Sequence, residues 1–200
     1  WYDDSLSISK KYDLALSKNL GGIGIWALGY DEGYDELWNL LKDKIAAKMP
    51  PATPVNFNII NLGNESILID FSSSENATSF EVSRVFEQKN ESESLGKFTT
   101  SPILLQNLSN DEPYFIKIRA ENDYGSSKYT ELLGVIPSQN SSKVLIVNGF
   151  DRVYGTDNTR DFILQHGNAI HKNNYIFDSA SNEAVINGHI KLNDYKIIDW

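Results

Sequence analysis

The sequence predicts three structural parts: the incomplete end of an α/β barrel, an all-β sandwich, and an incomplete α/β parallel sheet. In residues 114–121, apolar and polar side chains alternate with a period of two, as in a strand with one buried face. Residues 22–29 form an apolar run between two helical patterns, which is typical of a strand buried on both faces. Residues 143–147 form a second such run, followed by a helical pattern and two short strands.

The composition argues against several classes of function. The formal net charge is −9 and the pI is about 4.8, whereas nucleic-acid binding needs clustered Lys and Arg. The chain has no Cys, which excludes a thiol nucleophile or a Cys–metal site. No apolar run approaches the roughly 20 residues of a membrane span. We therefore expect no nucleic-acid partner, no membrane span, no metal site and no cofactor.

The first part, residues 1–49, contains two predicted helices and one strand. We expect helices over residues 9–20 and 34–47, with a buried strand over residues 22–29 between them. Helix, buried strand and helix form one unit of a TIM barrel, and one unit cannot bury its own faces. We therefore expect the remaining strands of the barrel to precede Trp1.

Motifs in this part resemble the end of a family 18 glycoside hydrolase, one of the chitinase-like barrels. The matching residues are Trp1-Tyr2-Asp3-Asp4, then Ser7 and Lys11, then Leu20-Gly21-Gly22-x-Gly24-x-Trp26. The resemblance implies that Trp26 binds substrate, as the floor of the sugar subsite at the cleaved bond. The alternative is that Trp26 is a core residue of an ordinary α/β protein.

The resemblance also implies a catalytic acid in an Asp-x-x-Asp-x-Asp-x-Glu motif on a middle strand, and this sequence lacks that motif. We therefore assign no catalytic residue and expect this chain alone to be inactive, although its parent is expected to be a glycosidase. Asp3, Asp4, Asp31 and Glu32 are interpreted as caps or solvated loop acids and not as the paired carboxylates of a glycosidase.

The second part, residues 50–137, follows a proline-rich linker at residues 49–54. We expect short strands at residues 55–59, 67–71 and 80–86, near Phe98, and at residues 114–121. Turns are expected at residues 61–64 and 72–76, and a charged hairpin tip at residues 87–93. No combination of residues in this part suggests catalysis.

Residues 108–127 resemble the F strand of a fibronectin type III domain, an immunoglobulin-like sandwich. Leu108 lies six residues before Tyr114, and the strand ends in Ala120-x-Asn122-x-x-Gly125. The resemblance implies that Tyr114 is a tyrosine corner, whose hydroxyl bonds the backbone of the preceding loop. Phe71 occupies the place where such domains usually carry a Trp. The alternative is an unrelated antiparallel strand before a turn, and the expected role of the sandwich is that of a spacer.

The third part, residues 138–200, is predicted to begin a doubly wound sheet. We expect strands at residues 143–151, 175–178 and 195–200, a helix at residues 158–173 and a helical turn at residues 182–186. Three strands with so few helices leave an edge and a face of the sheet uncovered. The segment resembles the start of a flavodoxin-like or class I glutamine-amidotransferase-like domain.

In open α/β sheets, ligands bind beyond the carboxyl ends of the strands. The candidate crevice residues are Asn148, Asp151, Arg152, Asp178 and Asn182. The alternative is that they only cap loops. His166, His171 and His189 lack the spacing of metal ligands and are interpreted as surface or partly buried residues.

These resemblances together imply a fragment of a secreted bacterial protein, extracellular or at the cell surface. The parent is expected to hydrolyse chitin-like glycans that contain N-acetylglucosamine, so its partner would be a glycan. One alternative is a non-catalytic surface or adhesion protein that binds glycans or other partners. Another places chemistry in the third part, with a nucleophile beyond Trp200.

Overall fold

The computed structural model describes residues 3–25, 33–45, 48–73, 75–86, 91–149 and 162–200. These residues form two compact units, Trp1–Pro50 and Pro51–Trp200. We describe each unit by itself. No helix among the described residues is both long and apolar enough to cross a membrane.

The first unit contains helices α1 (Ser5–Ser17) and α2 (Asp35–Lys44). Asp4 is the N-cap of α1, because its carboxylate accepts a hydrogen bond of 2.8 Å from the backbone N–H of Ser7. Asp3 accepts hydrogen bonds from the Ser7 hydroxyl at 3.1 Å and from Lys11 at 2.5 Å. The interpretation of Asp4 as a cap is confirmed. The Asp-Asp, Ser7 and Lys11 motif thus has a local structural role at the start of this helix.

The predicted strand after α1 differs from the structure. Residues 21–25 are not in a strand, Ile25 is 48% exposed, and residues 26–29 lie outside the described residues. Only Tyr12 and Ala15 are buried in the two helices. The physical reason is that the described residues of this unit offer no neighbouring strand to receive the backbone hydrogen bonds of a single strand.

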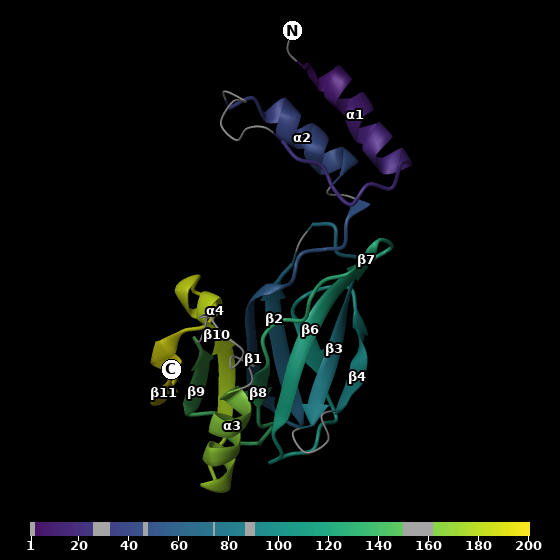
Figure 1. The fold of residues 1–200 in the computed structure, drawn as a ribbon. Coiled ribbons are helices and arrows are strands. Elements are labelled where there is room, and N and C mark those ends of the chain that lie inside the picture. Colours follow the sequence, from purple (N-terminus) through teal and green to yellow (C-terminus); the bar gives the residue numbers. More distant parts are fainter. Residues whose placement is uncertain (1–2, 26–32, 46–47, 74, 87–90, 150–161) are drawn as a thin grey trace. The chain divides into compact units, whose positions relative to one another are not determined.

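The second unit begins with an antiparallel sandwich, shown in Figure 1 in blue to green. Its strands are β1 (Val55–Gly63), β2 (Ser66–Ser72), β3 (Ser79–Phe86), β4 (Glu91–Phe98), β5 (Ile103–Leu105), β6 (Tyr114–Asn122), β7 (Gly125–Ser126) and β8 (Leu133–Val135). One sheet contains β1, β2 and β5, and the other contains β4, β3 and β6, with β7 and β8 paired to β6. The first expected turn begins later than predicted: β1 continues to Gly63, and the turn residues Gly63, Asn64 and Glu65 take positive φ.

The sandwich core confirms the expected alternation. Ile116, Ile118 and Ala120 are fully buried, and Tyr114 is 5% exposed. The Tyr114 hydroxyl accepts a hydrogen bond of 2.9 Å from the backbone N–H of Ser109, which confirms the predicted tyrosine corner. Phe71 is buried edge-on against Phe80, with ring centroids 4.7 Å apart, so a phenyl ring fills the core there.

Residues 144–199 continue the first sheet of the sandwich. They form β9 (Val144–Asn148), α3 (Phe162–Lys172), β10 (Phe177–Ser181), α4 (Asn182–Ile186), a 3-10 turn η2 (Leu192–Asp194) and β11 (Ile197–Asp199). β9 pairs in parallel with β10 and β11, as predicted, and β10 pairs antiparallel with β1. The result is one six-stranded sheet in the order β11-β9-β10-β1-β2-β5 (Figure 1).

The pairing of β10 with β1 covers an edge and a face of the α/β sheet that were expected to be uncovered. The edge of β10 is closed by β1, with Asn58 opposite Ala180 and Ile59 opposite Ser179. One core contains residues of both the sandwich and the α/β part: Phe115, Leu132, Ile136, Val144, Ile146, Ile163 and Phe177. A second core, which includes Leu145, Val147 and Ala184, lies on the α4 side. Both faces of β9 and β10 are therefore covered, because the sandwich supplies apolar surface that residues 138–200 lack.

Gly167 allows α3 to lie close to this shared core. A Cβ at this position would lie 2.6 Å from Cζ of Phe177 and 3.1 Å from Cε1 of Phe115. The first distance is far inside van der Waals contact and the second is tight, so a larger residue would push α3 or the Phe177 ring away. A glycine inside a helix costs about 1 kcal/mol relative to Ala, and here its small size allows the helix to pack against the sheet.

Candidate functional site

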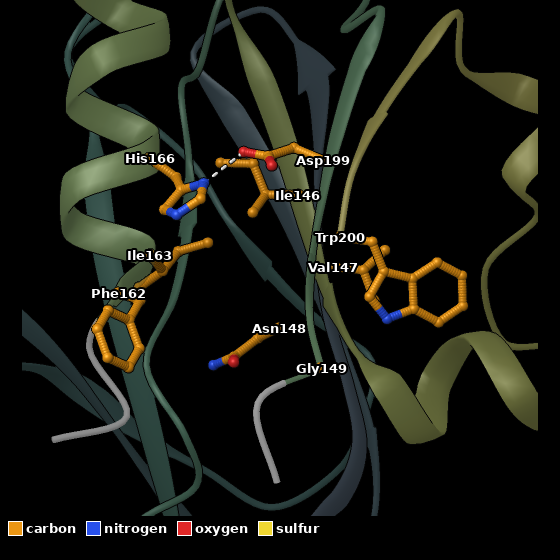
Figure 2. Close-up of a pocket in the computed structure, with 9 residues that line it drawn as sticks. All are labelled: Ile146, Val147, Asn148, Gly149, Phe162, Ile163, His166, Asp199 and Trp200. Carbon is orange, nitrogen blue, oxygen red and sulfur yellow. Dashed lines mark hydrogen bonds and ion pairs between the residues drawn. The ribbon is translucent and has the colours of Figure 1, made fainter. Parts of the chain in front are cut away.

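A pocket lies where the carboxyl ends of β9 and β11 meet the beginning of α3 (Figure 2). Its volume is about 410 Å³, within the usual range of small-ligand sites. The lining residues are Ile146, Val147, Asn148, Gly149, Phe162, Ile163, His166, Asp199 and Trp200. This is the end of a parallel sheet at which the fold places ligands.

Strand alternation and the turn of α3 determine which side chains enter the pocket. In β9, Ile146 belongs to the core on the α3 side and Val147 to the core on the α4 side, so Asn148 again faces α3. Figure 2 shows the Asn148 amide pointing into the space between β9 and α3, with the His166 ring above it. The Trp200 indole packs against Gly149, where an added Cβ would lie 2.5 Å from its Nε1.

His166 and Asp199 form the polar wall of the pocket. Nδ1 of His166 lies 2.6 Å from Oδ2 of Asp199, and both side chains are partly exposed. Among the described residues Nε2 of His166 has no hydrogen-bond partner, and Figure 2 shows it on the side of Asn148. A carboxylate that binds one imidazole nitrogen fixes the ring and leaves the other free to bind a ligand or accept a proton.

Among the described residues, the pair has no nucleophile beside it. A His–carboxylate pair activates a nucleophile only when a hydroxyl or thiol lies within hydrogen-bond reach. None of the nine lining residues is Ser, Thr or Cys. The described residues also contain no group of three His, Cys, Asp or Glu that could hold a metal ion. The arrangement is suited to binding by hydrogen bonds.

Of the predicted crevice residues, the structure places Asn148 in the pocket. Asp151 and Arg152 lie outside the described residues. Asn182 is the first residue of α4 and does not line the pocket. Trp26, the predicted sugar platform, also lies outside the described residues.

Asp178 lies away from the pocket because β10 begins later than predicted. The strand runs from Phe177 to Ser181, so Asp178 is near its amino end, opposite Leu145. Its Oδ1 accepts hydrogen bonds from the Ser142 hydroxyl at 2.7 Å and the Asn61 backbone N–H at 2.9 Å. Its Oδ2 accepts one from the Tyr195 hydroxyl at 2.9 Å. Asp178 therefore ties the sandwich strand β1 to the α/β part.

Burial dominates the electrostatics of this carboxylate. Asp178 is 5% exposed, and loss of solvation raises its pKa above the ordinary value, while the three hydrogen bonds act in the opposite direction. Burial, reinforced by the negative charge of Asp178, also raises the pKa of the Tyr195 hydroxyl. Both groups thus hold their protons more tightly in the folded protein than in the unfolded chain.

Sequence reasoning did not identify Phe162, His166 or Asp199 as pocket residues. Phe162, in the predicted helix 158–173, is 36% exposed and lines the opening. His166 was interpreted as a surface or partly buried residue, and its partner Asp199 lies two strands later in the chain. The available signal was positional: Asp199 lies near the carboxyl end of the third predicted strand, and Asn148 lies in the carboxyl half of the first, so both are at the same edge of a parallel sheet.

The comparisons with known proteins concern the sandwich. No protein-family model and no curated protein matches the chain. Similar solved structures are fibronectin type III domains. FN3tt is 19% identical, with a TM-score of 0.41, over 46% of this chain and 100% of that one. The FN5 domain of Drosophila Lar is 16% identical, with a TM-score of 0.38, over 45% and 99%. A domain of human fibronectin type III domain containing protein 3 is 16% identical, with a TM-score of 0.40, over 46% and 89%.

The sequence identities and TM-scores of these structures are too low to establish the fold of the sandwich. The assignment of the sandwich rests on the strand order of its two sheets and on the hydrogen bond between Ser109 and Tyr114.

Proposed function

We propose that residues 51–200 act as a rigid, non-catalytic connecting module of a larger carbohydrate-active protein. The observation that carries this proposal is the pairing of β10 with β1, which continues one sheet from the sandwich into the α/β part. Backbone hydrogen bonds, the shared core around Phe177 and the Asp178 network cross the junction. A junction of this kind holds a fixed angle, whereas a polar linker between separate domains would bend.

The finer part of the proposal concerns the parent protein. We propose that it is a secreted bacterial glycosidase whose chitinase-like barrel hydrolyses glycans that contain N-acetylglucosamine. Its support is the motif resemblance of residues 1–26, with Trp26 as the sugar platform. The domain boundaries at residues 49 and 137 remain part of this proposal. So does the flavodoxin-like start of the third part, which the spatial order β10-β9-β11 favours.

Rigidity can be tested by distance measurement between spin labels. The chain has no Cys, so Ser92→Cys in β4 and Lys196→Cys before β11 give two unique and exposed label sites. We expect a narrow distance distribution, as narrow as that of the control pair Ser92→Cys and Leu104→Cys within the sandwich. A broad distribution for the first pair only would overturn the connecting role.

Catalysis is tested separately, on a fluorogenic chito-oligosaccharide. We expect no turnover by the 200-residue chain, because the acid motif is absent from it. Turnover that survives further purification would contradict the non-catalytic assignment.

The adhesion alternative is favoured by one observation, the pocket beside α3.

A further inference from the structure

We propose that the pocket between α3 and the carboxyl ends of β9 and β11 binds a neutral saccharide unit. This site lies in the α/β part of the second unit, and it does not depend on the connecting role proposed above. The distance measurement between spin labels and the binding experiment below can therefore fail independently.

The described lining of the pocket offers no positive charge to an anionic ligand. None of its nine lining residues is Lys or Arg, and one is Asp199. Even with His166 protonated, the His166–Asp199 pair has no net positive charge. A phosphate or carboxylate would thus leave water without a cationic partner among the described residues, which is unfavourable. A neutral ligand avoids that cost.

The polar groups of the pocket favour a ligand rich in hydroxyls. Nδ2 of Asn148 makes only a long contact of 3.5 Å to the Leu132 carbonyl, and no bond to its Oδ1 is found among the described residues. The second imidazole nitrogen of His166 faces the same space (Figure 2). Asn offers both donors and acceptors, and imidazole offers either one. Hydroxyl groups also donate and accept, so adjacent hydroxyls on one ring can match both residues.

The remaining surface of the pocket is apolar. Ile146 and Ile163 belong to the core beneath it, and the Phe162 ring is partly exposed at its edge. A sugar ring has hydroxyls at its rim and C–H groups on its faces, so one face can cover these side chains while the rim meets Asn148 and His166. A wholly apolar ligand would instead bury those polar groups without partners, which costs free energy.

The experiment uses the 200-residue chain and nuclear magnetic resonance. The chain has three His, so the ring signal of His166 can be followed beside those of His171 and His189. The probes are N-acetylglucosamine, glucose and, as the anionic comparison, glucose 6-phosphate. We expect the two neutral sugars to shift the signals of the His166 ring and the Asn148 amide, with the other two His unchanged, and glucose 6-phosphate to bind more weakly.

Three variants decide the assignment. Asn148→Ala and His166→Gln should each weaken sugar binding by about tenfold, the value of one lost hydrogen bond. His171→Ala removes the same kind of ring from the same helix outside the pocket and should leave binding unchanged. Thermal unfolding of each variant shows whether the fold is intact.

Two results would overturn the proposal. One is the absence of any shift up to about 10 mM sugar, which corresponds to binding weaker than about −3 kcal/mol. The other is binding that Asn148→Ala and His166→Gln, both folded, leave unchanged. Tighter binding of glucose 6-phosphate than of glucose would refute the charge argument and with it the choice of ligand.

Discussion

Replacement of Asp178 tests whether its hydrogen bonds hold the two parts of the sheet together. In Asp178→Ala, the hydroxyls of Ser142 and Tyr195 and the backbone N–H of Asn61 lose their acceptor. A hydrogen bond to a charged group contributes about 1.5–3 kcal/mol, but burial of the charge itself costs several kcal/mol. We expect the free energy of unfolding to fall by about 3 kcal/mol.

The matched control is Asp178→Asn. Its amide oxygen can accept from Asn61 and Ser142, while its amide hydrogens face the Tyr195 oxygen, which can accept instead of donating. This change also removes a buried charge, so we expect stability within about 1 kcal/mol of the parent sequence at pH 7. The two variants therefore separate loss of the acceptor from loss of the charge.

Urea unfolding of the 200-residue chain provides the measurement. With a slope near 2 kcal/mol per molar, a loss of about 3 kcal/mol lowers the midpoint by roughly 1.5 M. Equal midpoints for Asp178→Ala and the parent sequence would refute the argument, since the three donors would then have no need of this acceptor. An Asn variant as unstable as the Ala variant would show that the charge, and not hydrogen bonding, matters.

The raised pKa of Asp178 predicts the direction of a pH effect. Because its pKa in the folded protein exceeds the unfolded value of about 4, the folded state binds the proton more tightly. The contribution of this group to stability is therefore fully present below pH 4 and is lost as the pH rises through the folded pKa. In Asp178→Asn this decline should vanish, so the stability of that variant relative to the parent should increase with pH. An unchanged difference between pH 4 and pH 8 would contradict the shift.

Two further substitutions test the packing described above. Tyr114→Phe keeps the ring but removes the acceptor for the Ser109 N–H, so we expect the free energy of unfolding to fall by about 1–2 kcal/mol in thermal or urea unfolding. The control is Tyr124→Phe, at a side chain that is 53% exposed, and it should leave stability unchanged. Equal effects of the two variants would argue against the tyrosine corner. Gly167→Ala gains about 1 kcal/mol of helix propensity but forces a Cβ against Phe177, so we expect a net loss of about 1–2 kcal/mol. The control is Ala169→Gly at an exposed position of the same helix, which measures the difference in helix propensity between Ala and Gly alone. A gain in stability for Gly167→Ala would mean that α3 moves freely.

The local alternation of apolar and polar residues predicted the strands of the sandwich well. The alternation from Tyr114 to Glu121, with Leu108 six residues earlier, fixes both the strand and its buried face. The parallel strands β9 and β11 were also predictable, because their apolar runs end in polar residues. Boundaries were less accurate: Asp178 ended the predicted second strand, whereas it lies near the start of β10.

Features that depend on distant residues were not predictable from local pattern. Alternation in β1 indicates a buried face but gives no information about its edge, and its partner β10 lies more than a hundred residues later. The contact between His166 and Asp199 depends in the same way on how α3 crosses the sheet. Gly167 is a further case, because its role is visible only once Phe115 and Phe177 are placed against it.

The antiparallel pairing of β1 with β10 has a consequence for how the chain folds. The opening strand of the sandwich acquires its second neighbour only from residues 177–181, so the pairing of β1 cannot be completed until those residues are present. Contacts between segments this far apart are slow to form, because a long loop must first be ordered. During synthesis, the backbone groups of β1 that pair with β10 therefore form an open hydrogen-bonding edge until residues 177–181 are made.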